Sequence, residues 1–185
     1  MNYISINFWM ACLLIGLVGC NNPQSGNTIE KEPTDQVSYV NAFKQFLGKP
    51  FSTLDIPSNL QKKDTTFEAE DGTTWPGLII FQNEQVLFWV ETSWIDTINI
   101  RTLTIVSPQI TFRDSIHVNS KFADIKSYLC DKIPSAPDGY FYLKDKLDNR
   151  IYYYFDIEGF PELSYRQPQF DSIPADLVIK SIVLY

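Results

Sequence analysis

Hydrophobic and polar positions follow the two-residue period of β-strands in most of the chain and the spacing of an α-helix in two short stretches. The helical stretches cover residues 37–47 and 121–130. Gly48 and Pro50 follow the first, and Pro134 follows the second, which is typical of helix ends. The apolar residues at helical spacing are Val37, Val40, Phe43 and Leu47 in the first stretch, and Phe122, Ile125 and Leu129 in the second.

The remaining apolar segments predict strands joined by tight turns. Asp71-Gly72 and Asn83-Glu84 each separate two such segments, as in hairpins. The runs beside Asn83-Glu84 are almost continuously apolar, which predicts a central, well-buried pair of strands. Near Arg101 the alternation changes phase, which predicts a bulge or bend. The predicted strands are residues 65–70, 77–82, 85–91, 97–106, 139–144, 150–157 and 177–185.

These elements predict an α+β fold in which two short helices pack on an antiparallel sheet. A finer expectation is a tandem helix-plus-hairpin repeat. Residues 49–54 are similar to residues 121–125 when one residue is skipped, and each segment is followed by a hairpin and a further strand. The order of elements resembles that of small outer-membrane-assembly lipoproteins and of tandem β-lactamase-inhibitor-like domains.

The N-terminal segment predicts export. Residues 4–19 carry no charge and are mostly apolar, but the run is shorter than the roughly 20 residues of a membrane span. It suits the apolar core of a signal peptide, although no Lys or Arg precedes it. The sequence Leu17-Val18-Gly19-Cys20 resembles the lipobox of bacterial lipoproteins. The resemblance implies that the signal is cleaved before Cys20 and that the Cys20 thiol receives a lipid carrying fatty acids such as palmitate.

Three regions follow from this interpretation. Residues 1–19 are the signal peptide, residues 20–35 are the lipidated cysteine and a flexible tether rich in polar residues and proline, and residues 36–185 are one globular domain. Some Bacteroidetes lipoproteins carry an acidic run directly after the lipidated cysteine as a surface-export signal, but here the first acidic residue is Glu30. We therefore expect a cell-envelope protein anchored in the outer membrane and facing the periplasm.

Charge narrows the range of partners. The formal net charge is -7, and every charged residue follows Cys20. An acidic domain is poorly suited to binding nucleic acid or anionic lipid, so membrane attachment is assigned to the lipid on Cys20. The expected partners are an envelope protein or a glycan.

The sequence offers few candidates for catalysis. His117, the only histidine, follows Asp114 and Ser115 so closely that the segment is interpreted as a strand-to-helix loop. The nearby carboxylates Glu68, Glu70 and Asp71 flank a hairpin turn, where they are normally solvated. We predict no catalytic residue, no metal ligand and no cofactor.

The last free thiol is that of Cys130. Cys12 leaves with the signal peptide and Cys20 is lipidated, so Cys130 has no partner for an intramolecular disulfide. Its helical apolar neighbours predict a small residue on or beside the buried face.

Aromatic residues are the most unusual feature of the chain. Trp75, Trp89 and Trp94 lie close in sequence, and three consecutive tyrosines occupy positions 152–154 of a predicted strand. Alternation places Tyr153 on the core face and its two neighbours on the other. That second face is either covered by another element or open for binding. The candidate binding surface comprises Tyr152, Tyr154, Trp75 and Trp94.

The expected function is that of a membrane-anchored, non-enzymatic protein-interaction module. One alternative is a module that binds glycan or peptidoglycan, for which two or three coplanar exposed rings on the sheet would argue. A second alternative is a divergent enzyme, for which a deep cleft with converging carboxylates would argue.

Overall fold

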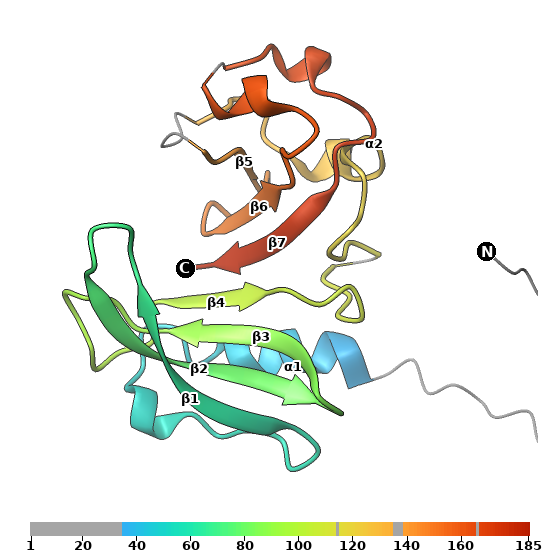
Figure 1. The fold of residues 1–185 in the computed structure, drawn as a ribbon. Helices are drawn as coiled ribbons and strands as arrows, with labels where there is room; N and C mark the ends of the chain where they lie inside the picture. The colour runs from blue at the N-terminus through green and yellow to red at the C-terminus, as the bar shows by residue number, and fades with distance from the viewer. Residues whose placement is uncertain (1–34, 114, 135–138, 166) are drawn as a thin grey trace, which may run out of the picture. The chain divides into compact units, whose positions relative to one another are not determined.

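The computed structural model describes residues 35–113, 115–134, 139–165 and 167–185. The described residues all belong to one compact unit, which lies within residues 32–185 (Figure 1). The predicted signal peptide, Cys20 and the tether up to residue 34 lie outside the described residues.

The described domain is built on one seven-stranded sheet in which every neighbouring pair of strands is antiparallel. The strand order is β1-β2-β3-β4-β7-β6-β5. The sheet dominates an α+β fold in which the helices are short. The strands are β1 (Gln61–Glu68), β2 (Thr74–Gln82), β3 (Gln85–Glu91), β4 (Thr102–Ile105), β5 (Tyr142–Lys144), β6 (Ile151–Phe155) and β7 (Ile179–Leu184).

The two turns predicted from the sequence connect the first three strands. Asn83 and Glu84 both have positive φ, at 49° and 67°, as a two-residue hairpin turn requires. In the β1–β2 turn, Gly72 has a φ of 81° and the Asp71 carboxylate accepts a hydrogen bond from the Thr73 amide at 2.9 Å. Local sequence therefore determines how β1, β2 and β3 are connected.

The helices are shorter than their apolar patterns predict. Helix α1 spans Asp35–Lys44, and α2 spans only Phe122–Ile125 before a 3₁₀ turn η2 at Lys126–Tyr128. Further 3₁₀ turns are η1 (Phe51–Thr53), η3 (Pro161–Ser164) and η4 (Phe170–Ser172). Within the described ranges, no helix combines the length and apolar character needed to cross a membrane.

The core lies between the helices and one face of the sheet. Phe43 of α1 packs on Phe88 of β3, with ring centroids 5.0 Å apart. Phe122 of α2 contacts Phe155 of β6 at 6.3 Å. The buried sheet residues on this face pair across the strands and include Leu78, Ile80, Phe88, Val90, Leu103, Ile105, Ile151, Tyr153, Ile182 and Leu184.

Two strand expectations need correction. The β2–β3 pair is buried on the core face only, since Trp89 on the other face is 38% exposed. The strand predicted over residues 97–106 begins only at Thr102, and Ile98 lies in the preceding loop, 66% exposed. Of the predicted bulge or bend, the bulge is wrong, because the register of β4 is regular; the chain bends at residues 97–98, and the phase change near Arg101 marks the start of β4.

The sheet joins two runs of consecutive strands through the pairing of β4 with β7, in which Thr104 lies opposite Val183. Similar bridges precede these two strands. Pro50, just before η1, pairs with Asn99, and Lys121, just before α2, pairs with Val178. Each run thus begins with a helical turn that is tied to the segment leading into its last strand.

Candidate functional site

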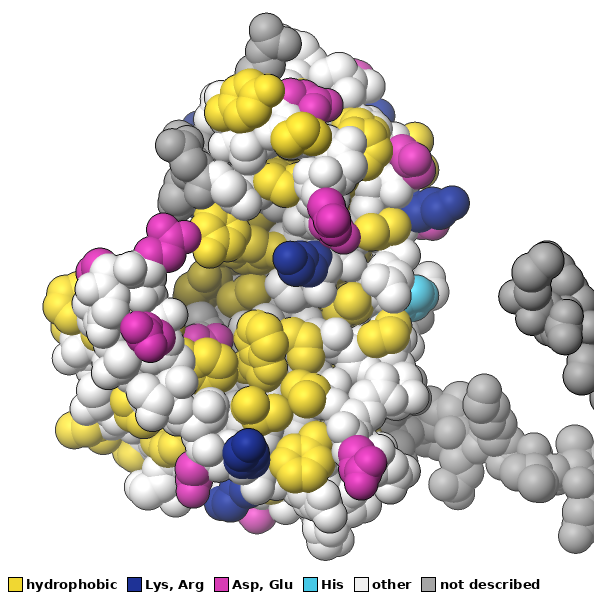
Figure 2. Space-filling model, in the orientation of Figure 1, with side chains coloured by type: hydrophobic (Ala, Val, Ile, Leu, Met, Phe, Trp, Pro, Cys, Tyr) yellow, Lys and Arg dark blue, Asp and Glu magenta, His cyan; other side chains and the backbone are white. Residues whose placement is uncertain are grey.

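The face of the sheet opposite the helices carries the candidate site. Trp89, Thr104, Val183 and Tyr152 lie in one row across β3, β4, β7 and β6, because their strands pair in that register. Figure 1 shows α1 behind the strands, and Figure 2, in the same orientation, shows hydrophobic side chains gathered around a hollow in front of them. We call this surface the open face.

The hollow contains a pocket of about 410 Å³, here called the aromatic pocket. Its rings come from β2, β3 and β6 and from the segments after β3, before β5 and after β7, so the long-range β4–β7 pairing is needed to assemble it. Three of its rings are well exposed. The six aromatic residues lining it are Trp75, Trp89, Trp94, Tyr140, Tyr154 and Tyr185.

Glu91 also lines the aromatic pocket. Its Oε2 accepts a hydrogen bond from Trp75 Nε1 at 3.1 Å. Burial raises the pKa of the Glu91 carboxyl, and hydrogen bonds from the side chains of Trp75 and Thr104 oppose that rise. The carboxylate is therefore held between two neutral donors in a half-buried, aromatic setting.

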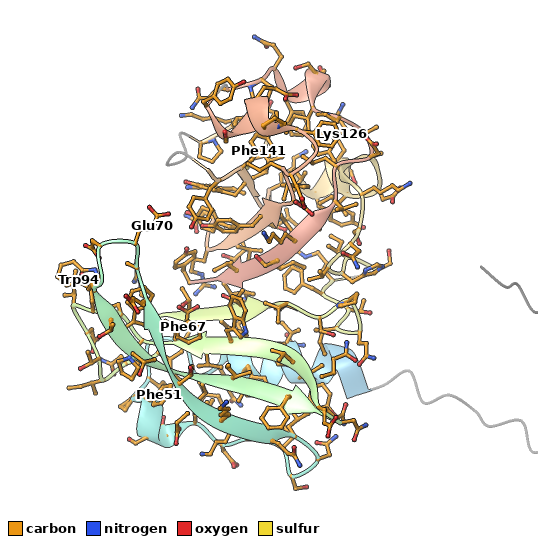
Figure 3. The ribbon with its side chains drawn as sticks, in the orientation of Figure 1. Phe51, Phe67, Glu70, Trp94, Lys126 and Phe141 are labelled. Carbon is orange, nitrogen blue, oxygen red and sulfur yellow. The ribbon has the colours of Figure 1, made fainter. Side chains whose placement is uncertain are left out.

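A close approach between β1 and β2 fixes the edge of this surface. The Phe67 ring lies over Gly77, where a Cβ atom would be only 2.3 Å from Phe67 Cε2. The same ring stacks near Trp75, with centroids 6.5 Å apart, and contacts Trp89 at 6.0 Å. Gly77 thus lets Phe67 (labelled in Figure 3) fill the space between two tryptophans.

Tyrosines form the opposite side of the open face. Tyr154 contacts Tyr142 at 5.0 Å and Tyr140 at 6.3 Å, the latter with rings almost perpendicular at 87°. Burial and a hydrogen bond with Tyr185 raise the pKa of Tyr154. Tyr152 also packs edge-on against Tyr185, at 5.2 Å and 78°. Two of these contacts are edge-to-face, and Tyr142 and Tyr154 are inclined by 32°, so the tyrosine cluster is not one flat surface.

A second hollow of about 700 Å³ continues the surface past β6 and β7. It shares Trp89, Tyr140 and Tyr154 with the aromatic pocket, so the two form one groove. Its far end carries two carboxylates, Asp156 and Glu158, and one cation, Lys180.

The loop between β3 and β4 borders the aromatic pocket with exposed apolar side chains. Trp94, Ile95 and Ile98 are 63%, 78% and 66% exposed. Asp96 holds their backbone in place, because its carboxylate accepts hydrogen bonds from the amides of Ile98 and Asn99, both at 3.0 Å. Those bonds, with that from the Asn99 side chain, lower the pKa of Asp96. Figure 3 shows Trp94 at the margin of the sheet.

The predicted surface residues are partly brought together. Trp75, Trp94 and Tyr154 line the aromatic pocket, whereas Tyr152 lies beside it and contacts Tyr185. Sequence reasoning missed Glu91, Tyr140 and Tyr185. The i, i+2 relation of Trp89 to Glu91 could have placed this carboxylate on the aromatic face, but only the long-range pairing of β4 with β7 brings Tyr185 near it.

Residues considered for catalysis lie elsewhere. His117 precedes α2, and its Nδ1 lies 2.6 Å from the Val118 carbonyl oxygen. Glu68, Glu70 and Asp71 are exposed near the β1–β2 turn, where Figure 3 shows Glu70. Among the described residues, no group of three or more His, Cys, Asp or Glu side chains could hold a metal ion.

Cys130 is half-buried and lies outside the main core, since its segment leaves the helix before Leu129 and pairs with β5. Its amide donates to the Lys144 carbonyl at 2.9 Å, and its Sγ lies 3.6 Å from the Asp145 carbonyl oxygen.

Asp145 is a fully buried carboxylate whose hydrogen bonds all serve the fold. Its Oδ2 accepts from Arg113 Nη1 at 2.6 Å and from the Tyr153 hydroxyl at 2.8 Å. Its Oδ1 accepts from the amides of Leu147 and Asp148. Burial raises the pKa of Tyr153, which keeps the phenol protonated as a donor. This group is fully paired within the fold, unlike Glu91.

A scan against protein-family models finds no match, and a search of curated proteins finds no significant match. Among solved structures, the chain is similar to the crystal structure of the uncharacterized protein yfeY from Escherichia coli. The sequence identity is 15% and the TM-score 0.45, over 67% of this chain and 80% of that one.

Proposed function

We propose that this chain is a lipid-anchored protein of the cell envelope whose folded domain binds another protein on its open face. The observation that carries the proposal is the aromatic groove, which the described residues leave uncovered and which runs continuously from the β3–β4 loop to β6. Soluble domains seldom expose large aromatic side chains in one contiguous patch unless the patch binds something. Trp and Tyr are also the residues that contribute most to protein interfaces.

Ring geometry favours a protein over a glycan as the ligand. Sugars stack on flat aromatic surfaces, whereas Tyr140 and Tyr154 meet at 87° and Tyr152 and Tyr185 at 78°. Rings in such edge-to-face clusters form walls, between which a side chain of a partner can insert. The exposed apolar tips of Trp94, Ile95 and Ile98 add a contact surface suited to a hydrophobic partner.

The anchor part of the proposal depends on the sequence alone. The lipobox-like segment ending at Cys20 supports attachment to the outer membrane through a lipid, with the domain on the periplasmic side.

We also infer that the domain is a tandem repeat. The first unit runs from η1 through β2, β3 and β4, with β1 added at the edge, and the second runs from α2 through β5, β6 and β7. The equivalent bridges Pro50–Asn99 and Lys121–Val178 support this assignment. The open face would then be formed where the last strands of the two units pair.

A parallel screen of peptides and glycans tests the proposed function. The full chain, purified in detergent, is panned against a random displayed peptide library and applied to an array that includes peptidoglycan fragments. We expect selected peptides to lose binding to Trp94→Ala and Tyr140→Ala but not to the control Leu147→Ala, whose side chain is 81% exposed outside the groove. Binding of peptidoglycan fragments that requires the same two aromatics would contradict the proposal.

A further inference from the structure

Glu91 is a charged group without a charged partner in the part of the chain that the structure describes. The described salt bridges join Lys44 and Arg150 to Asp148, Arg113 to Asp145, and Lys126 to Asp171, and none includes Glu91. Its two hydrogen-bond donors, Trp75 and Thr104, are neutral. Partial burial of a carboxylate removes water from its charge, and neutral donors compensate the lost hydration only in part. A bound cation would compensate the rest.

The surroundings of Glu91 match the requirements of a cation. Aromatic faces attract cations through their quadrupoles when the cation lies within about 6 Å of the ring centroid. Trp75, Trp89 and Tyr154 line the same pocket as Glu91. The pocket volume of about 410 Å³ is large enough for a lysine or arginine side chain. Aromatic walls and one carboxylate together select positive charge over neutral groups.

Among the described residues, Arg101 is the cation that lines this pocket, and it forms no salt bridge with Glu91. Its guanidinium lies over the Tyr185 ring, 5.9 Å from the centroid. It is exposed, and it also lines the neighbouring hollow near Asp96 and Arg150. This contact demonstrates that the rim of the pocket accommodates a guanidinium on an aromatic face.

We propose that the aromatic pocket binds a lysine or arginine side chain of the partner polypeptide, with Glu91 as its counter-charge. The inference rests on the proposed function, because it specifies what part of a protein partner enters the groove. The net charge of -7 and the adjoining hollow, in which the carboxylates Asp156 and Glu158 outnumber the single cation Lys180, favour a basic segment over an acidic one.

The indole N–H of Trp75 provides a direct probe, since it donates to Glu91. The full chain is titrated with Nα-acetyl-lysine methylamide, with the arginine equivalent, and with the uncharged norleucine equivalent, while the indole resonances are followed by NMR. We expect the two cationic compounds to shift the Trp75 resonance and the norleucine compound to leave it unchanged.

Charge-removing variants isolate the role of the carboxylate. Glu91→Gln keeps an acceptor for Trp75 but removes the charge, and we expect it to weaken binding of the cationic compounds about tenfold, corresponding to about 1.4 kcal/mol. The matched control Glu68→Gln removes the same charge from an exposed residue of β1 and should bind as wild type does. Arg101→Gln should tighten binding, because it removes a competing cation from the rim.

The outcomes separate this inference from the proposed function. If the peptide screen yields ligands that bind equally well to Glu91→Gln, the cation site is wrong and the protein-binding groove stands. If Nα-acetyl-lysine methylamide binds wild type more tightly than Glu91→Gln but no peptide is selected, the cation-binding pocket stands and the proposed function fails. Tighter binding of tetramethylammonium than of either amino-acid compound would assign the pocket to a small quaternary amine and overturn the inference. The inference would also be overturned if the norleucine equivalent shifted the Trp75 indole resonance as much as the two cationic compounds do.

Discussion

Glu91 and Asp145 are both acidic side chains within the fold, yet their surroundings differ. Asp145 accepts from Arg113, Tyr153 and two backbone amides, so its charge is fully compensated. Glu91 has neutral donors only, and burial raises its pKa. The first arrangement stabilises the fold, whereas the second is typical of a group held ready for a ligand at some cost in stability.

Because the charged form of Glu91 destabilises the fold, its replacement should change the free energy of unfolding in a pH-dependent way. A raised pKa means that the folded protein binds the proton more tightly than the unfolded chain, so the charged carboxylate destabilises the fold above its folded-state pKa. We expect Glu91→Gln to be more stable than wild type towards urea at about pH 7. The difference should disappear at about pH 4, as the wild-type carboxyl takes up its proton. A variant less stable than wild type at neutral pH would contradict the account.

At the scale of elements, alternation predicted the two faces of β6 correctly. Ile151, Tyr153 and Phe155 are buried, while Tyr152 and Tyr154 are half-buried on the open face. The turns Asp71-Gly72 and Asn83-Glu84 were also predictable, because turn geometry depends on neighbouring residues. The pairing of β4 with β7 was not, since nothing local in either strand specifies a distant partner. The convergence of Tyr185 and Glu91 could not be predicted for the same reason.

The burial difference within β6 predicts unequal costs of truncation. Phe155→Ala should lower the free energy of unfolding by about 3–5 kcal/mol, because it removes a ring that packs on Phe122 and Phe141 in the core. Tyr152→Ala and Tyr154→Ala should each cost about 1 kcal/mol, since their rings retain contact with solvent. Urea denaturation of the three variants compares these values. Equal losses would mean that the open face is covered in solution.

The close approach of Phe67 in β1 to Gly77 in β2 predicts the effect of adding one methyl group at position 77. A Cβ at position 77 would approach Phe67 Cε2 to 2.3 Å and the Val90 carbonyl oxygen to 2.7 Å. Gly77→Ala should therefore displace Phe67 and destabilise the fold by about 1–3 kcal/mol. Gly159→Ala is the matched control, because nothing lies within 4 Å of its added Cβ. Thermal melts that leave Gly77→Ala unchanged would show that Phe67 does not occupy this position.

The edges of the sheet favour a ligand on the face over one added as an extra strand. Edge strand β1 carries the charged side chains Lys62, Lys63 and Asp64, and such charges discourage strand addition. Edge strand β5 is only three residues long. The open face is therefore the surface of the domain best suited to a stable partner contact.

For the whole molecule, the lipobox-like segment predicts anchoring through Cys20. Cys20→Ala should abolish lipid attachment, since the thiol is the atom to be alkylated. Cells grown with an alkyne analogue of palmitate should label the wild-type chain and not the variant. The variant Cys130→Ala controls for acylation of the other cysteine and should label as wild type does. Equal labelling of Cys20→Ala would contradict the lipobox interpretation.

The most direct test of the binding face is a map of the residues that respond to a ligand. Amide and indole NMR signals of the full chain are recorded with and without a selected basic peptide. We expect the largest changes at Trp75, Glu91, Tyr154 and Tyr185, with little change in α1 or in the core residues behind the sheet. Changes concentrated on α1, or along the free edge of β1, would place the binding site elsewhere and contradict the claim that the open aromatic face binds the partner.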